Sequence, residues 1–119
     1  MSNQIFINII PINILINFLN SICKIENGFF IFTNESYKRS LLHNNLSKFI
    51  NDISPYYHKS KKHYIERKMN FTHLATLVRQ ICRSHSIAYT SKLVYSSSTY
   101  NIRYIISIPN STNLSGSEK

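Results

Sequence analysis

The chain has few of the residues on which many catalytic and metal-binding motifs depend. Its 119 residues include two Gly, three Pro and two Cys. The glycines, Gly28 and Gly116, cannot form a glycine-rich phosphate loop. Two cysteines provide neither a disulfide framework nor a zinc ribbon. Because Cys23 and Cys82 both occur in apolar periodic segments, we expect buried, reduced thiols, which fits an intracellular protein.

Acidic residues are equally scarce, with five Asp and Glu in the whole chain. So few carboxylates provide no pair placed for hydrolysis or two-metal catalysis. A metal site would need Cys82 and His85 to converge with His58 and His63, and there is no second cysteine pair. We therefore expect no enzyme activity, no catalytic residue, no metal and no other cofactor.

The first 23 residues carry no charged side chain. They contain neither the basic start nor the small-residue cleavage site of a signal peptide. Asn13, Asn17 and Asn20 fall on one side of a helix running from about Pro11 to Cys23, and the other side is apolar. The pattern predicts an amphipathic helix, and because the asparagines interrupt the apolar run, a membrane partner is not expected.

Positive charge is what the chain has in excess. Fourteen Lys and Arg give a formal net charge of +9, and twelve of them lie between Lys38 and Arg103, against two acids in that segment. A domain this basic usually meets a polyanion, either nucleic acid or an anionic surface. The alternative is a basic surface that serves only solubility.

One domain over residues 1–109 and a disordered polar tail over residues 110–119 are expected from this length and composition. After the first helix, Glu26-Asn27-Gly28 predicts a tight turn, and Phe29–Thr33 a short apolar strand. Apolar residues then recur at helical spacing from Tyr37 to Ile50, with Asn34 or Ser36 as the expected N-cap.

The next two helices are predicted from their starting residues. Ser54 as N-cap and Pro55 at the first helical position predict a strongly basic helix over Tyr56–Lys68. Asn70 or Thr72 begins the following helix, which ends near Arg83. Its expected inward stripe consists of Phe71, Leu74, Leu77, Val78, Ile81 and Cys82, and its expected outward side of Thr72, Thr76, Arg79, Gln80 and Arg83.

A β-hairpin is predicted after this helix, from Tyr89–Tyr95 and Thr99–Ile108 with a serine-rich turn. The predicted fold is therefore α+β, with about four helices, a C-terminal hairpin and one short extra strand. Without the basic helix, the order is helix–strand–helix–helix–strand–strand, which is that of a winged helix. In that fold the helix before the hairpin enters the major groove of DNA.

Two motifs strengthen the winged-helix reading. Gly28-Phe-Phe-Ile-Phe-Thr-Asn34 and Asn70-Phe-Thr-His-Leu-Ala-Thr-Leu-Val-Arg-Gln-Ile81 are similar to the heat-shock-factor type of winged helix. The resemblance implies that Arg79 reads bases. The chain departs from that family in its extra basic segment and in Ile81-Cys82-Arg83, where the family continues with an aromatic residue and glycine.

A second resemblance covers about Leu15 to Ile106. Ser60-Lys-Lys-His-Tyr64, Leu77-Val-Arg-Gln-Ile-Cys82 and Ser98-Thr-Tyr-Asn-Ile-Arg-Tyr104 resemble short uncharacterised proteins of giant DNA viruses. It implies no known activity. If the chain is viral, the expected location is host cytoplasm or nucleus, or the virion.

The leading hypothesis from the sequence is nucleic-acid binding, with DNA favoured over RNA. Arg forks and Lys side chains hold phosphates, and Arg also reads guanine. The expected contacts are the outward residues Thr72, Thr76, Arg79, Gln80 and Arg83 and the cations Lys59, Lys61, Lys62, Arg67, Lys68, Lys92 and Arg103. The alternatives are solvated basic faces, or a non-enzymatic structural protein whose basic surface meets an acidic protein partner, as in a virion or assembly component.

Overall fold

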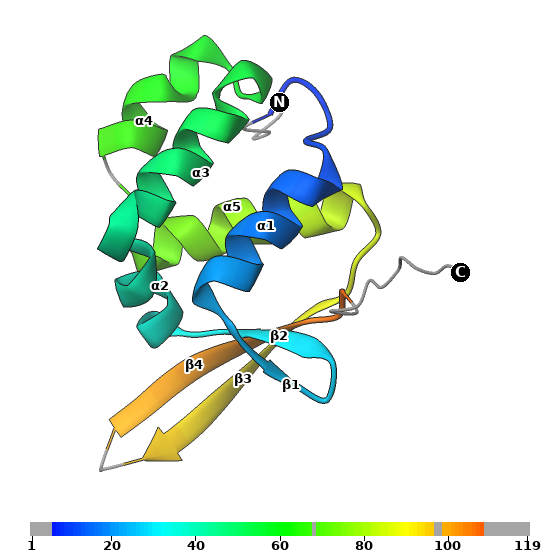
Figure 1. Ribbon diagram of the computed structural model, residues 1–119, viewed down its shortest axis with the longest axis vertical. Helices are drawn as coiled ribbons and strands as arrows, with labels where there is room; N and C mark the ends of the chain where they lie inside the picture. The colour runs from blue at the N-terminus through cyan, green and yellow to red at the C-terminus, as the bar shows by residue number, and fades with distance from the viewer. Residues whose placement is uncertain (1–5, 68, 97–98, 109–119) are drawn as a thin grey trace.

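The computed structural model describes residues 6–67, 69–96 and 99–108, so Lys68 and the expected tail over 110–119 lie outside the described residues. The fold is α+β, with a helical layer beside an antiparallel sheet (Figure 1). The helices are α1 (Ile12–Ile22), α2 (Asn34–Ser40), α3 (Asn45–Ile53), α4 (Lys62–Arg67) and α5 (Phe71–Ser84), and the strands are β1 (Lys24–Glu26), β2 (Phe29–Phe32), β3 (Tyr89–Ser96) and β4 (Thr99–Ile106).

The sheet has the order β1-β2-β4-β3, with antiparallel pairing throughout. Asn27 and Gly28 join β1 to β2 with φ values of 53° and 85°, which a tight hairpin turn requires. The turn was predicted, but the short strand β1 before it was not. Phe30 pairs with Ile106, so segments that are far apart in the sequence meet in the centre of the sheet.

The core lies between the helices and one face of the sheet. Phe18 of α1 and Phe49 of α3 stack with ring centroids 4.0 Å apart. The predicted amphipathic pattern of α1 is confirmed, because its three asparagines are exposed. The predicted inward stripe of α5 is confirmed from Leu74 to Cys82, and Phe71 is half-buried. The largest fully buried side chains are Phe30, Phe32, Phe49, Ile10, Leu15, Leu19, Ile22, Ile53, Ile65, Leu74, Leu77 and Ile81.

The predicted single helix through Tyr37 and Ile50 is wrong, because the chain breaks between α2 and α3. His43 and Asn44 have φ values of 56° and 59°, which an α-helix does not allow. Leu41 and Leu42, which belong to the apolar pattern between Tyr37 and Ile50, are exposed as a result. The N-cap is Thr33, which forms a reciprocal capping box with Ser36.

The predicted basic helix over Tyr56–Lys68 is also shorter than expected. Residues Ser54–Tyr56 and Lys59–Lys61 form 3-10 turns, and the α-helical part is α4 alone. Ser54 does not cap a helix, since its hydroxyl donates to the Asn51 carbonyl. Tyr57 is extended and forms a β-bridge with Phe6, which interrupts the helix that Pro55 was expected to start.

The predicted helix from Asn70 and the predicted hairpin after it are confirmed. Asn70 is the N-cap of α5, and its side-chain oxygen accepts from the His73 N–H at 2.9 Å. The hairpin of β3 and β4 follows, in a register that pairs Tyr89 with Ile106 and Leu93 with Ile102. This unit fixes which side of α5 faces outward.

Candidate nucleic-acid interface

The outward side of α5 is the centre of the candidate interface. Thr72, Thr76, Arg79 and Arg83 are exposed, and Gln80 is half-buried. α5 contains no acidic residue, and within the described residues no ion pair involves Arg79 or Arg83. The two guanidinium groups, one helical turn apart, are therefore available for an external anion.

Tyr89 connects the start of β3 with α5. The hydroxyl of Tyr89 donates to the Ala75 carbonyl at 3.0 Å, which holds β3 against the helix. Burial raises the pKa of Tyr89, and the nearby positive charge of Arg79 acts in the opposite direction. The charge of Arg79 is thus close enough to act on the Tyr89 hydroxyl.

The two threonines are not equivalent polar contacts. The Thr76 hydroxyl donates to the Thr72 carbonyl at 3.0 Å, within the helix. Its oxygen can still accept a hydrogen bond, but its proton is already used. A phosphate accepts only, so of the two hydroxyls Thr72 is the better donor to the backbone of a nucleic acid.

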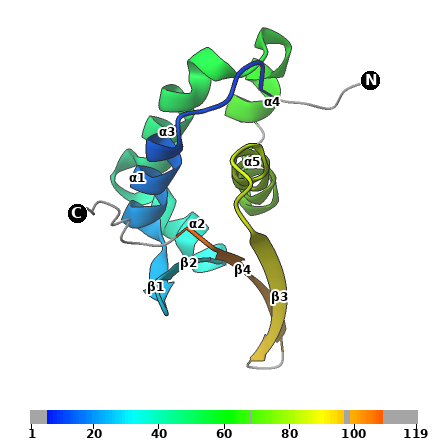
Figure 2. The same cartoon turned by 90° about the vertical axis from the view of Figure 1, so that its right-hand side faces the viewer.

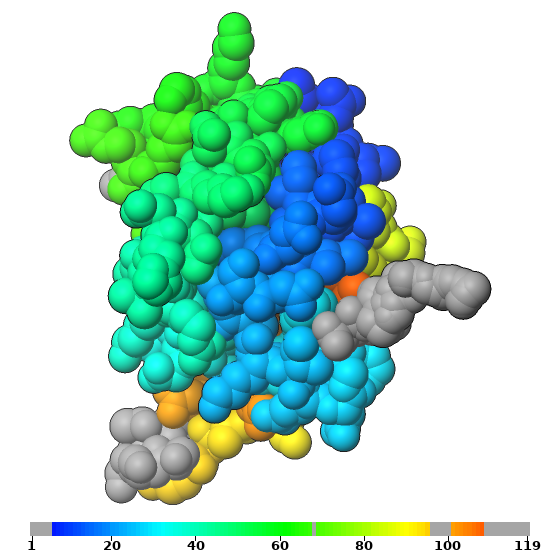
Figure 3. Space-filling view, viewed as in Figure 1, coloured from blue at the N-terminus to red at the C-terminus, as the bar shows by residue number. Residues whose placement is uncertain are grey.

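α4, α5 and β3 follow one another along one side of the molecule, whereas α1, α3 and β1 lie on the opposite side (Figure 2). Figure 3, which is viewed as in Figure 1, shows a surface made mostly by the segments before α5, with the hairpin at the bottom. The outward side of α5 is therefore on the other side of the molecule from α1 and α3.

The basic segment, residues 56–68, contains cations that differ in how far their charge is compensated. Lys62 is paired with Glu66 at 2.6 Å, and Glu66 also accepts a hydrogen bond from the Tyr57 hydroxyl. Lys59 is exposed, and Lys61 lies 6.0 Å from the centre of the Tyr64 ring. Lys59 and Lys61 therefore contribute more uncompensated charge than Lys62.

Tyr64 bridges the basic segment and α5. Its ring meets that of His73 edge-on, with centroids 4.7 Å apart, and Tyr64 remains 40% exposed. This contact brings Lys61 and the first turns of α5 to one surface. The contact has no local signal in the sequence, because Tyr64 and His73 are nine positions apart.

Arg67 does not join this surface in the same way. It lines a groove with residues of α2 and α3, among them Tyr37 and Leu46. Lys68 lies outside the described residues. The structure therefore links Lys61 to the α5 side more directly than Arg67.

Lys92 and Arg103 lie on the face of the hairpin that points away from the core. They are directly paired across the strands, so they share a face, and it alternates with the face of Tyr104 and Ile106. Arg103 is compensated by Glu26 at 2.9 Å. Because α5 packs on the other face through Tyr89 and Tyr104, these two cations are not brought onto its outward side.

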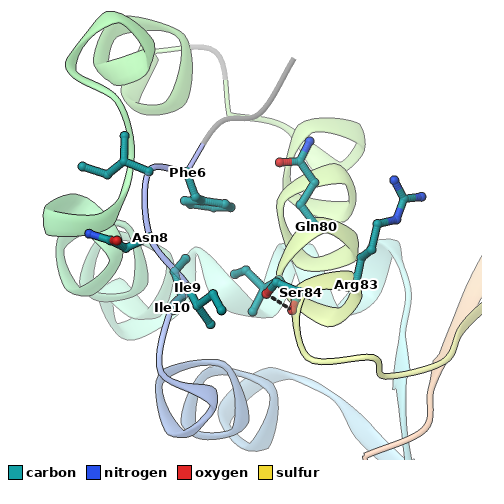
Figure 4. Close-up of a pocket in the computed structure, with 9 residues that line it drawn as sticks. Phe6, Asn8, Ile9, Ile10, Gln80, Arg83 and Ser84 are labelled. Carbon is teal, nitrogen blue, oxygen red and sulfur yellow. Dashed lines mark hydrogen bonds between the residues drawn. The ribbon is translucent and has the colours of Figure 1, made fainter. Parts of the chain in front are cut away.

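The sequence did not predict a groove beside the second half of α5. It has a volume of about 520 Å³ and separates the segment Phe6–Ile10 from Gln80, Arg83 and Ser84 (Figure 4). Ile10 of this groove is also held by His85, whose Nε2 forms a 2.6 Å hydrogen bond with the Ile10 carbonyl. The apolar residues before Pro11 were the only local signal for it.

The thiols and histidines show no reactive arrangement. Cys82 is buried as expected, and Cys23 is half-buried instead of buried. Desolvation raises the pKa of each thiol to about 12. In the described ranges, no three His, Cys, Asp or Glu side chains are grouped as metal ligands, and no helix there is long and apolar enough to cross a membrane.

Comparison with known proteins does not assign the site. The chain matches no protein-family model, no curated protein and no solved structure.

Proposed function

We propose that this chain binds duplex nucleic acid, and DNA in preference to RNA, through the outward side of α5. The observation that carries the proposal is the pair of exposed guanidinium groups of Arg79 and Arg83, which form no ion pair with a described residue, on a helix without acidic residues. The formal net charge of +9 supplies long-range attraction to a polyanion.

The arrangement of the elements supports a winged-helix manner of binding. Apart from β1 and α4, the order is α1, β2, the α2–α3 pair, α5, β3 and β4. In winged helices the helix before the hairpin lies in the major groove. The major groove of B-form DNA admits a helix, whereas that of A-form RNA is too deep and narrow, which favours DNA.

The basic segment would act as a second phosphate contact. Lys61 approaches the first turns of α5 through Tyr64, whose ring contacts His73, and the exposed Lys59 belongs to the same 3-10 turn as Lys61. Arg79 and Arg83 would hold phosphates or guanine, and Lys59 and Lys61 would hold phosphates of a neighbouring turn. The function is non-enzymatic in this proposal.

The test is fluorescence anisotropy with a labelled duplex over a salt series. We expect Arg79→Ala/Arg83→Ala to weaken binding. The fall of the logarithm of the association constant with the logarithm of the salt concentration should also become less steep by about 2, because each phosphate contact contributes about 1 to the magnitude of this slope. Lys24→Ala/Lys48→Ala removes the same charge from β1 and α3, on the other side of the molecule (Figure 2), and is the matched control.

Equal losses in the two double variants would reduce the binding to a non-specific effect of net charge and refute a site on α5. Loss only on Lys59→Ala/Lys61→Ala/Lys62→Ala would instead move the site to the basic segment. No binding by the unmodified protein would favour the other hypothesis, a structural protein with an acidic protein partner.

A further inference from the structure

β3 forms an open edge of the sheet. The strand order ends with β3, which pairs with β4 on one side, and no strand of the described residues pairs with its other side. With eight residues it is much longer than β1, the strand at the opposite edge. A long open edge presents backbone groups that can pair with another strand.

The hydrogen bonds at the base of the hairpin show which backbone groups point outward. The Ser107 N–H donates to the Ala88 carbonyl at 3.1 Å, and these residues continue the β3–β4 register. Closely spaced and widely spaced pairs alternate in an antiparallel ladder. The even-numbered residues of β3 therefore bond to β4, and Ser91, Leu93 and Tyr95 direct both N–H and C=O to the open edge.

The side chains along this edge lack the usual protection against strand pairing. Lys92 is the only charged residue of β3, and its side chain lies on the face of Arg103. Leu93 is 63% exposed on the other face, beside the exposed Ile102. Edge strands that remain single usually carry several charges or a proline, and β3 has neither.

We propose that β3 pairs antiparallel with β3 of a second copy of this chain, about a twofold axis through Leu93. In an antiparallel pair, residues opposite one another have their side chains on the same face of the sheet. Because side chains alternate between the faces along a strand, a twofold axis between two β3 strands must pass through one residue and not between two. An axis at Lys92 would oppose two lysines, and one at Val94 would pair only residues 92–96. An axis at Leu93 pairs residues 90–96 and places Lys92 opposite Val94 of the partner subunit.

This register makes the edge complementary to itself, as a twofold interface requires. Positions 91, 93 and 95 form closely spaced pairs, with about two backbone hydrogen bonds each. Leu93 meets Leu93 of the partner subunit on the apolar face, and the two sheets become one continuous sheet. The interface uses neither the outward side of α5 nor the basic segment, so self-association is separate from nucleic-acid binding.

Sedimentation of the full chain without nucleic acid, from about 1 to 100 µM, tests the proposal. We expect a dimer that dissociates on dilution. Leu93→Pro removes an outward N–H without removing a β4 hydrogen bond, as edge strands tolerate, and should yield a monomer. Leu93→Lys retains the backbone but opposes two charges at the axis, and should weaken the dimer at least tenfold.

Ile102→Lys is the matched control, because it adds the same charge on the same face one strand away from the edge, and it should remain dimeric. Circular dichroism checks folding, and if Leu93→Pro does not fold, Leu93→Lys decides. An unmodified protein that is monomeric throughout, or a dimer that Leu93→Lys does not weaken, overturns the proposal.

Discussion

At the scale of single residues, Glu66 joins the two ends of the basic segment. Its carboxylate accepts from the Lys62 ammonium at 2.6 Å and from the hydroxyl of Tyr57, which is buried. The hydrogen bond from Lys62, followed by that from Tyr57, lowers the pKa of Glu66 below its usual value. Because Tyr57 also forms the bridge to Phe6, this one carboxylate ties α4 to the N-terminal segment.

The lowered pKa of Glu66 predicts a pH-dependent contribution to stability. The contribution is present above the usual carboxyl pKa of about 4.3 and is lost as pH falls through the lower folded value. We expect Glu66→Gln to reduce the urea midpoint at pH 7, with the difference shrinking as pH falls below the usual carboxyl pKa and through the lowered folded value. Glu35→Gln, which removes the looser 3.9 Å pair with Lys38, is the control and should show little change at either pH.

At the scale of elements, the break between α2 and α3 is the main departure from the predicted pattern. Tyr37, Leu41, Leu42 and Leu46 follow helical spacing, which does not reveal a turn. The turn consists of His43 and Asn44 with positive φ, and neither glycine nor proline marks it. Asn adopts this conformation at lower cost than most residues, but Asn is too common in this chain to signal one turn.

His43→Gly distinguishes the break from a continuous helix. A left-handed non-glycine residue costs about 1–2 kcal/mol, and glycine adds about 0.5–1 kcal/mol of unfolded-state entropy. The expected net change is therefore zero to about 1.5 kcal/mol of stabilisation. In a continuous helix the same change would cost about 1 kcal/mol, as we expect for the control Lys48→Gly inside α3. Urea unfolding measures both.

At the scale of the whole molecule, charge and groove recognition make different demands on Arg79 and Arg83. Long-range attraction depends on the number of positive charges, whereas bidentate contact with guanine or phosphate depends on the planar guanidinium fork. In the proposed function most of the affinity is electrostatic. The two contributions can be separated without changing the net charge.

Arg79→Lys/Arg83→Lys preserves the formal net charge of +9. We expect its affinity for a random-sequence duplex to stay within about threefold of the unmodified protein, with the same salt slope, because non-specific binding follows counterion release. Anisotropy titrations beside the alanine pair measure this. A loss as large as that of the alanine pair would show that the fork, and not the charge, supplies the affinity.

Local patterns were sufficient wherever one element carries its own signal. The period of apolar residues and Asn70 as N-cap predicted α5 and its outward residues, and alternation predicted the hairpin. β1 was missed because a three-residue strand has almost no pattern of its own. The basic segment was overextended because charge density carries no information about where a helix ends.

The sequence by itself determined the α+β class, the basic character of the chain and which side of α5 is apolar, because periodicity and charge act within one element. Only the tertiary structure decided which cations share a surface. Pairing of Phe30 with Ile106 and the contact of Tyr64 with His73 join distant segments. These contacts bring Lys61 towards α5, turn Lys92 and Arg103 to the other face of the hairpin, and leave β3 at an open edge, since packing between elements depends on all of them at once.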